Sequence, residues 1–297
     1  MDIRPDPGVS NYIDTGESSF VRAMPTIGME YRYPFISVQS WGTQTIEPIA
    51  QIIARPSEKL VGKLPNEDAQ SLIFDDSNLF RVDKFSGYDR QEGGDRVNYG
   101  LQYTAQLNRG GFFNVLFGQS YHLFGENSFA VGDITNTGLN SGLDSRRSDY
   151  VARVSYQPDR ILTLSTRYRF DEDTFEVRRF EAEARVNFDR WSLSALYGNY
   201  DKQPELGFLT RREGILAGAS VKVNQNWVVT GAARYDLDSD RFDQTRIGVG
   251  YVDDCFILAV NYITSYSYSA DTKTDHRLLL QLNLRTIAGT NISTGGL

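Results

Sequence analysis

The sequence predicts an all-β protein, an antiparallel up-and-down outer-membrane β-barrel of about thirteen strands, of which this chain forms a part. First, polar and apolar residues alternate with a period of two over many segments, the pattern of strands with one apolar and one polar face. Second, the turns between these segments alternate between short and long, as on the two rims of an up-and-down barrel. Third, the 297 residues include 17 Tyr, 17 Phe and 26 Gly, which suits the aromatic girdles and glycine-rich turns of membrane barrels.

Several function classes are disfavoured by composition. A run of about 18 apolar residues is absent, so no transmembrane helix is expected, and the start lacks the basic and apolar regions of a secretory signal. The net charge of −7 disfavours nucleic acid as a partner. His122 and His276 are the only histidines, and neither HExxH nor GxSxG occurs. We therefore expect no catalytic residues, no metal site and no cofactor, and the chain is not expected to be an enzyme.

The first 94 residues contain two candidate strands and a long insertion. Residues 1–18 are interpreted as a polar coil, and residues 19–297 as the barrel portion. Alternation runs from Phe20 to Pro34 and again from 45 to 54, where Pro48 removes a ladder donor and so predicts an edge or bulge. Residues 55–94 are too long for a hairpin loop, and loops of this length are commonly functional or mobile.

The clearest hairpin follows this insertion. Residues 96–107 alternate strictly, and the alternation resumes over 113–122 after the turn at 108–111. Residues 124–148 are rich in Gly, Asn, Asp and Ser, which predicts a long external loop with a short strand at Ser128–Val131.

The remaining strands recur at regular spacing up to residue 285, with acidic loop runs at 171–173 and 236–243. These runs are interpreted as solvated, with binding of divalent ions as the alternative. Aromatic residues near strand ends predict interfacial belts: Phe170, Phe188, Trp191, Tyr197, Trp227 and Tyr235.

A soluble barrel or sandwich would share the period of two, and the strand count separates the alternatives. About thirteen long strands enclose an interior too wide for side chains to fill, so the polar face is expected to line a wet lumen. Glu181 and Glu183 lie on one face of one strand, which favours a solvated wall over a catalytic pair. The candidate lumen wall comprises Arg96, Asn98, Gln102, Arg179, Glu181, Glu183 and Arg185.

The segment LFRVDKFSGYDR at 79–90, followed by GLQY and GQSYH, resembles the LptD family of LPS-assembly proteins (the OstA, organic-solvent-tolerance family). The Ile46-Glu47-Pro48 strand, the Asp253-Asp254-Cys255 hairpin and the closing LQLNLRTIAGT agree with this resemblance. The family-motif loop comprises Phe85, Ser86, Gly87, Asp89 and Arg90.

The resemblance implies a protein of the outer membrane of Gram-negative bacteria that receives lipopolysaccharide from the periplasm and releases it into the outer leaflet. The implied partners are lipopolysaccharide, an LptE-like lipoprotein plug, the periplasmic Lpt bridge proteins, the Bam machinery for insertion, and outer-membrane lipid. Family members are longer and carry a signal peptide, a periplasmic jellyroll and a first half-barrel. This chain is therefore expected to be the C-terminal half of the barrel, as a fragment, a truncated reading frame or a degraded copy.

Two further expectations come from the resemblance. Cys255 matches cysteines that form disulfides with the N-terminal domain, although a small buried hydrophobe is the alternative. The last strand of a lateral gate would comprise Arg277, Leu278, Leu280, Gln281, Leu282, Asn283, Leu284 and Arg285. The competing functions are a passive porin-like channel and a barrel lipase or protease, whose catalytic set the sequence lacks.

Overall fold

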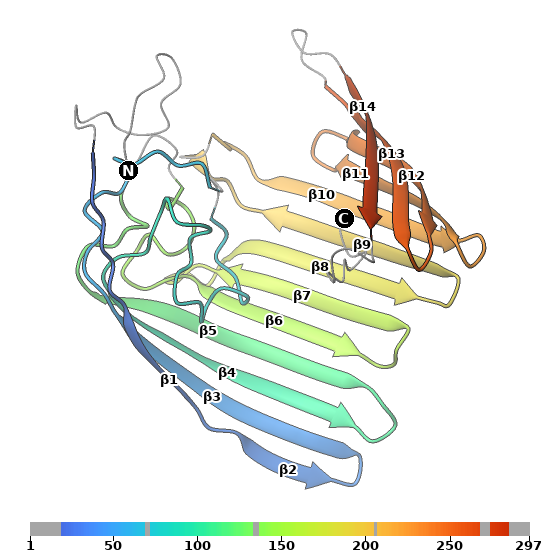
Figure 1. Cartoon of the computed structure of the whole chain (residues 1–297). Coiled ribbons are helices and arrows are strands. Elements are labelled where there is room, and N and C mark those ends of the chain that lie inside the picture. Colours follow the sequence, from blue (N-terminus) through green and yellow to red (C-terminus); the bar gives the residue numbers. More distant parts are fainter. Residues whose placement is uncertain (1–18, 69–71, 133–136, 205–206, 268–273, 285–297) are drawn as a thin grey trace. The chain divides into compact units, whose positions relative to one another are not determined.

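The structure is a computed structural model that describes residues 19–68, 72–132, 137–204, 207–267 and 274–284. All the secondary structure described is β (Figure 1). The fourteen strands are β1 (Ile27–Arg32), β2 (Phe35–Gln39), β3 (Gly42–Ala54), β4 (Asp95–Leu107), β5 (Phe112–Phe124), β6 (Tyr150–Gln157), β7 (Leu162–Phe170), β8 (Val177–Asn187), β9 (Trp191–Tyr200), β10 (Arg212–Lys222), β11 (Trp227–Asp236), β12 (Arg241–Val252), β13 (Phe256–Ser265) and β14 (Asp275–Leu284).

The strands form one antiparallel sheet in chain order. The order is β1-β3-β4 and onward to β14, with β2 also paired to β3. Among the described residues, β14 pairs only with β13, and β1 and β2 pair only with β3, so the sheet is not closed. The prediction of an all-β, up-and-down antiparallel fold is confirmed, and an open sheet is consistent with part of a barrel.

The first three strands correct the predicted boundaries. The sequence predicted two strands before residue 55, whereas the structure has three, because Tyr33 and Pro34 interrupt the extended segment and separate β1 from β2. β3 pairs with β1 through Ile49–Ala54 and with β2 through residues 42–46. Pro48 lies between these two pairings and opposite Leu101 of β4, and its carbonyl accepts from the N–H of Tyr33 (3.3 Å).

Each strand presents an apolar face and a polar face. In the β4–β5 pair, Leu101 lies opposite Phe117 and Tyr103 opposite Val115 on the apolar face. Leu101 is 49% exposed, and the exposed apolar side chains continue along other strands. Arg96 and Asn98 lie on the opposite, polar face and are buried. Because an apolar face of this extent is not left in water, this arrangement suits a strand that meets lipid.

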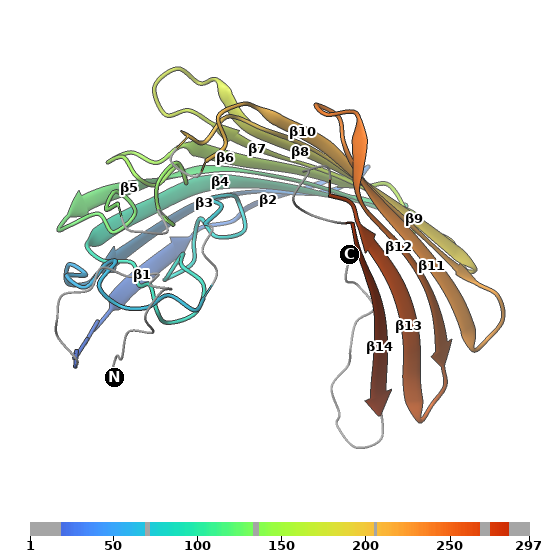
Figure 2. The ribbon, with the colours of Figure 1, turned by 90° about the horizontal axis from the view of Figure 1, so that it is seen from above.

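The chain divides into two compact units. The first comprises Met1–Ser155, Thr166–Phe180 and Asp201–Arg211, and contains the long loops. The second comprises Tyr156–Ser165, Glu181–Tyr200 and Arg212–Leu297, and consists mainly of hairpins. In the first unit, the loops before β4 and after β5 lie against one face of the strands (Figure 2).

The short strand predicted at Ser128–Val131 is wrong, because this segment forms turns. The backbone N–H of Ala130 donates to the carbonyl of Asn127 (3.0 Å), and the N–H of Phe129 donates to the Asn127 side chain (3.2 Å). The amide of Asn127 also donates to the carbonyl of Leu143 (2.8 Å). An Asn that satisfies its own turn competes with strand pairing, which explains the difference.

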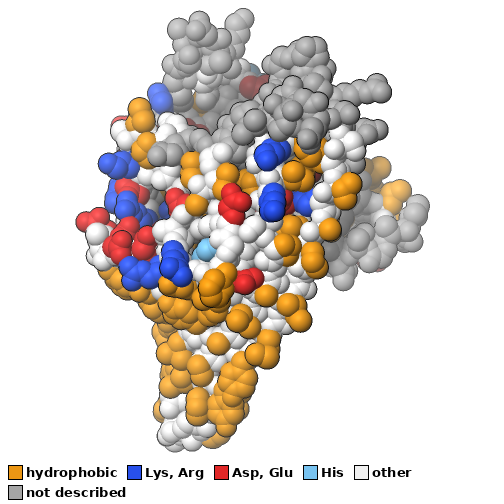
Figure 3. Space-filling model, turned by 90° about the vertical axis from the view of Figure 1, so that its left-hand side faces the viewer, with side chains coloured by type: hydrophobic (Ala, Val, Ile, Leu, Met, Phe, Trp, Pro, Cys, Tyr) orange, Lys and Arg blue, Asp and Glu red, His pale blue; other side chains and the backbone are white. Residues whose placement is uncertain are grey.

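Among the described residues, no helix has the length and apolar character needed to cross a membrane. Figure 3 shows hydrophobic side chains over the lower part of the first unit and charged side chains gathered above them. The exposed hydrophobic residues of β1 and β2 are Ile27, Met29, Tyr31, Phe35, Ile36 and Val38.

Candidate functional site

Two loops cover the polar face of β4 and β5: the insertion, residues 55–94, and the second loop, residues 125–149. Beneath them, the amide of Asn98 donates to Oε1 of Gln51 (2.7 Å), and the hydroxyl of Ser120 donates to Oδ1 of Asn98 (2.6 Å). Asn98 and Ser120 have no exposed surface. The polar side chains of this part of the sheet therefore bond within the protein.

The two loops also pack on each other. The N–H of Gly93 donates to the hydroxyl of Ser128 (2.9 Å), and the rings of Phe85 and Phe129 lie 4.7 Å apart. Each buried Leu or Phe contributes about 1.5–3 kcal/mol, so this cluster helps to hold the two loops together. Its members are Leu72, Phe74, Leu79, Phe85, Phe129, Leu143 and Val151.

Glu92 is the centre of a buried charge network at the base of the insertion. Its carboxylate pairs with Arg96 of β4 and lies 3.6 Å from Nζ of Lys84, and all three side chains are at most 2% exposed. Nη1 of Arg55 donates to the Glu92 carbonyl (2.8 Å). Arg96 also lies over the ring of Phe129 (5.0 Å), so one side chain contacts both loops.

The pKa values in this network follow from burial and charge. Burial lowers the pKa of Lys84 to about 8. Burial acts to raise the pKa of Glu92, but the charges of Lys84 and Arg96 outweigh it and hold this pKa below its usual value. Removing one partner would leave an uncompensated buried charge.

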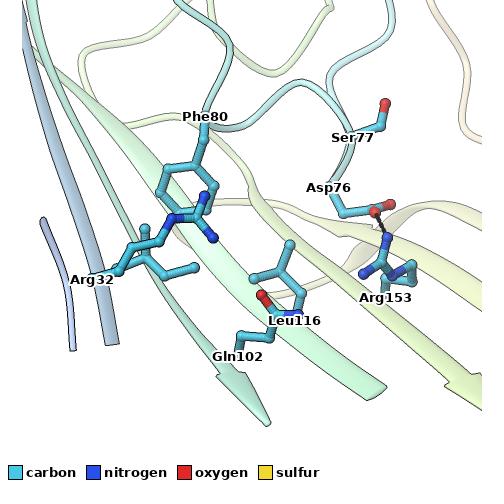
Figure 4. A pocket seen from close by; sticks show the side chains of 8 residues that line it. Arg32, Asp76, Ser77, Phe80, Gln102, Leu116 and Arg153 are labelled. Carbon is cyan, nitrogen blue, oxygen red and sulfur yellow. Dashed lines mark ion pairs between the residues drawn. The ribbon is translucent and has the colours of Figure 1, made fainter. Parts of the chain in front are cut away.

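A second carboxylate, Asp76, joins the insertion to the strands. It pairs with Nη1 of Arg153 in β6 (3.1 Å) and Nε of Arg167 in β7 (3.3 Å), and its side chain has no exposed surface. Burial raises the pKa of Asp76 despite the opposing charge of Arg153. Figure 4 shows Arg153 directed at Asp76 at the wall of a pocket of about 260 Å³. The pocket is lined by Arg32, Ile49, Asp76, Ser77, Phe80, Gln102, Leu116 and Arg153.

Three carboxylates meet where the second loop enters β6: Asp149, Asp171 and Glu172. Asp149 pairs with Nε of Arg169 (3.0 Å), and Asp171 pairs with Arg178 (2.6 Å). Burial raises the pKa of Asp149 to about 7, against the charge of Arg169. The backbone N–H of Thr174 and the guanidinium of Arg178 hold the pKa of Asp171 well below its usual value. Two of the three carboxylates, Asp149 and Asp171, are thus each paired with an arginine.

The family-motif loop forms a clamped turn inside the insertion. Gly87 has φ +74°, and a Cβ there would lie 2.0 Å from Oδ1 of Asp68. The Asp68 carboxylate accepts from the N–H groups of Tyr88 and Asp89 (both 2.8 Å). The guanidinium of Arg90 is buried and donates to the carbonyl of Leu64 (2.9 Å). Phe85 belongs to the apolar cluster, and Ser86 is exposed. The motif residues thus shape the insertion itself.

The candidate lumen-wall residues lie in two different settings. On β4, Arg96 and Asn98 are covered by the insertion, and Gln102 lines the pocket. On β8, Glu181 accepts from the hydroxyl of Tyr200 (2.7 Å), and Arg185 pairs with Glu183. Arg179 is half-buried. The structure groups the β4 residues with the loops, and the role of either set as a lumen wall stays a prediction.

The two expectations near the C-terminus fall on exposed elements. Cys255 lies in the turn between β12 and β13, is exposed, and donates its N–H to Oδ1 of Asp253 (2.8 Å). The predicted gate strand coincides with β14 from Arg277 to Leu284, and its leucines are exposed. Arg285 lies outside the described residues.

Lys84, Glu92, Asp76 and Asp149 were not among the predicted site residues. All four lie in loops, where no periodicity assigns a face. The available signal was the set of large apolar residues inside the insertion, Leu72, Phe74, Leu79 and Phe85, which a solvated loop would not need.

An antiparallel up-and-down sheet with exposed apolar side chains on one face and buried charges on the other defines the class: the wall of an outer-membrane-type β-barrel. The family model of LptD, described as LPS transport system D, matches residues 5–207 and 196–291. The chain belongs to the LptD family, and its membership together with this fold places it in the outer membrane of a Gram-negative bacterium.

Similar proteins include the LPS-assembly protein LptD of Pectobacterium atrosepticum, 26% identical over 96% of this chain and 38% of that protein. LptD of Vibrio cholerae is 26% identical over 74% of this chain and 29% of that protein. The chain thus spans well under half the length of these relatives. Among solved structures, one mutant of Rh. blastica porin aligns over 89% of this chain and 82% of its own, with 14% identity and a TM-score of 0.43.

Proposed function

We propose that this chain is the C-terminal part of the barrel of a lipopolysaccharide-assembly translocon, which inserts lipopolysaccharide into the outer leaflet of the outer membrane. The single observation that carries the proposal is family membership over most of the chain. The two-faced sheet supports it, because an apolar face toward lipid and a polar face toward an interior suit a barrel that handles an amphiphile. Assembly and transport, rather than catalysis, is the activity proposed.

We further propose that strands from outside this sequence pair with β14 and with the β1/β2 edge. The one-sided pairing of these strands supports this, since unpaired backbone groups in hydrocarbon cost several kcal/mol each. In this proposal β14 is the last strand of a lateral gate, and the exposed thiol of Cys255 forms a disulfide with another segment of the whole protein. An LptE-like lipoprotein, the periplasmic Lpt proteins and the Bam machinery are the proposed partners.

The test is depletion of the protein in cells that rely on it, with labelling of surface lipopolysaccharide by an antibody that cannot cross the membrane. We expect newly made lipopolysaccharide to disappear from the surface while its total amount stays unchanged. Normal surface labelling together with reduced uptake of small hydrophilic solutes would contradict the proposal and favour a porin-like channel instead.

The Cys255 proposal has its own measurement. A Cys255→Ser variant should lose a disulfide-dependent mobility shift on a non-reducing gel. An identical pattern of bands for both proteins would contradict the disulfide.

A further inference from the structure

A group of aromatic and basic side chains lies on the apolar face at the loop end of β5–β7. We call it the aromatic–arginine rim, and it comprises Phe117, Tyr121, Arg146, Arg147, Tyr150 and Phe175. The rings of Phe117 and Tyr150 stack 5.5 Å apart, and Phe175 lies 5.1 Å from Tyr150. Phe170 of β7 extends the group at 5.0 Å from Phe175. All these residues belong to the first compact unit.

Phe175 holds its position in a disfavoured backbone conformation. Its φ is +61°, in the left-handed region that bulky residues rarely adopt. The surrounding turn fixes it, because its N–H donates to the carbonyl of Asp171 (3.1 Å) and the N–H of Asp171 donates to the carbonyl of Glu176 (2.9 Å). The residue nevertheless remains 53% exposed. A glycine would satisfy this backbone better, so the exposed ring itself is the feature that requires an explanation.

Two arginines stand beside the rings. The guanidinium of Arg146 lies over the ring of Tyr121 (5.5 Å), and Arg147 forms a β-bridge with Tyr121. Both side chains are exposed. Arg147 pairs with Asp173, two residues before Phe175, so the arginines and the raised ring belong to one rim. Asp173 is the acidic group that faces Arg147, and this carboxylate is itself 69% exposed.

We propose that the aromatic–arginine rim binds the phosphate-bearing headgroup of a membrane lipid that lies against the outside of the sheet. The rings contact the upper part of the acyl chains, where aromatic side chains favour the interface. Arg146 and Arg147 donate to the phosphate, since a guanidinium presents several donors in a geometry that fits phosphate oxygens. Arg147 exchanges Asp173 for the phosphate when the lipid binds. This site is independent of the transport proposed above, because it needs only an outer-membrane location.

The test uses the protein extracted from the outer membrane in detergent, with native mass spectrometry of bound lipid. The probes are phosphatidic acid, which carries a bare phosphate monoester, and phosphatidylcholine with the same acyl chains. We expect preferential binding of phosphatidic acid. In the double variant Arg146→Gln, Arg147→Gln this preference should fall on the order of tenfold, as expected for the loss of one or two charge-assisted hydrogen bonds.

A second pair of variants tests the ring. Phe175→Gly keeps the left-handed backbone and should weaken binding of both lipids, whereas Phe175→Trp should retain it. Arg109→Gln is the matched control, because Arg109 is also exposed but lies in the short turn between β4 and β5. Undiminished preference in the double arginine variant would overturn the proposal. Displacement of the lipid by an equal concentration of inorganic phosphate would also overturn it, because the rim would then be a site for free anions.

Discussion

Glu92 is surrounded by Lys84, Arg96 and Arg55. The side chains of Lys84 and Arg96 form buried ion pairs with its carboxylate. Glu92→Gln would leave Lys84 and Arg96 buried without a counter-charge, which costs about 3–5 kcal/mol. We therefore expect the insertion to detach from β4 while the sheet persists. Hydrogen exchange of residues 72–94 should accelerate, and that of the β10–β13 strands should not change.

Glu183→Gln is the matched control for this variant. Glu183 pairs with Arg185, whose side chain is 59% exposed, and such exposed pairs contribute about 0–1 kcal/mol. Equal acceleration of exchange in both variants would show that the charge network does not hold the insertion.

Asp149 gives the second loop a predictable pH dependence. Its pKa is about 7 in the folded protein against 3.8 ordinarily, so the folded form binds more protons between these values. Its contribution to stability is therefore greatest below pH 3.8 and is lost as the pH rises towards 7. Exchange of residues 137–149, corrected for the intrinsic rate, should be faster at about pH 8 than at about pH 5. Asp149→Asn should abolish the difference, and a difference of the same size in that variant would refute the assignment.

At the scale of elements, the insertion approaches the β4–β5 pair through two glycines that lie directly opposite each other, Gly100 and Gly118. A Cβ on Gly118 would lie 2.5 Å from Cδ2 of Leu79 and 2.6 Å from the carbonyl oxygen of Tyr99. Gly118→Ala should therefore displace Leu79 and cost about 1–3 kcal/mol. The measurement is limited proteolysis within the insertion, which should become faster.

Gly250→Ala provides the comparison for Gly118→Ala. A Cβ at Gly250 in β12 would come no closer than 3.8 Å to a neighbouring heavy atom. The protease should cut the insertion of Gly250→Ala at the wild-type rate. If it also cut the insertion of Gly118→Ala at the wild-type rate, the close approach of Leu79 to Gly118 would be contradicted.

The strands were predictable from sequence because a period of two directly reports two different environments. The first and last residues of β4 and β5, for example, lie within two residues of the ends of the alternating segments 96–107 and 113–122. β2 was not predictable in this way. Pro34 separates it from β1, and its five residues are too few to show a period of two. The same holds for the site. Arg96 and Asn98 could be assigned to the polar face, but their partners Glu92 and Gln51 depend on a loop fold and a strand pairing that no local pattern encodes.

At the scale of the molecule, β14 and the β1/β2 edge each have one side that is unpaired among the described residues, and these sides determine how this chain behaves alone. Exposed backbone N–H and C=O groups cost several kcal/mol each in hydrocarbon. We therefore expect the isolated chain not to insert into vesicles as a monomer. The measurement is heat-modifiable migration on a gel after refolding, and a protease-resistant monomer band would contradict the expectation.

The insertion and the second loop are each joined to strands at both ends, to β3 and β4 and to β5 and β6. A separate protein that covered the same polar residues would dissociate upon dilution, whereas a covalently attached segment stays at a fixed effective concentration. Re-covering of Arg96 and Asn98 after a transient opening is consequently a first-order event, whose rate is the same in a sparsely and a densely populated membrane.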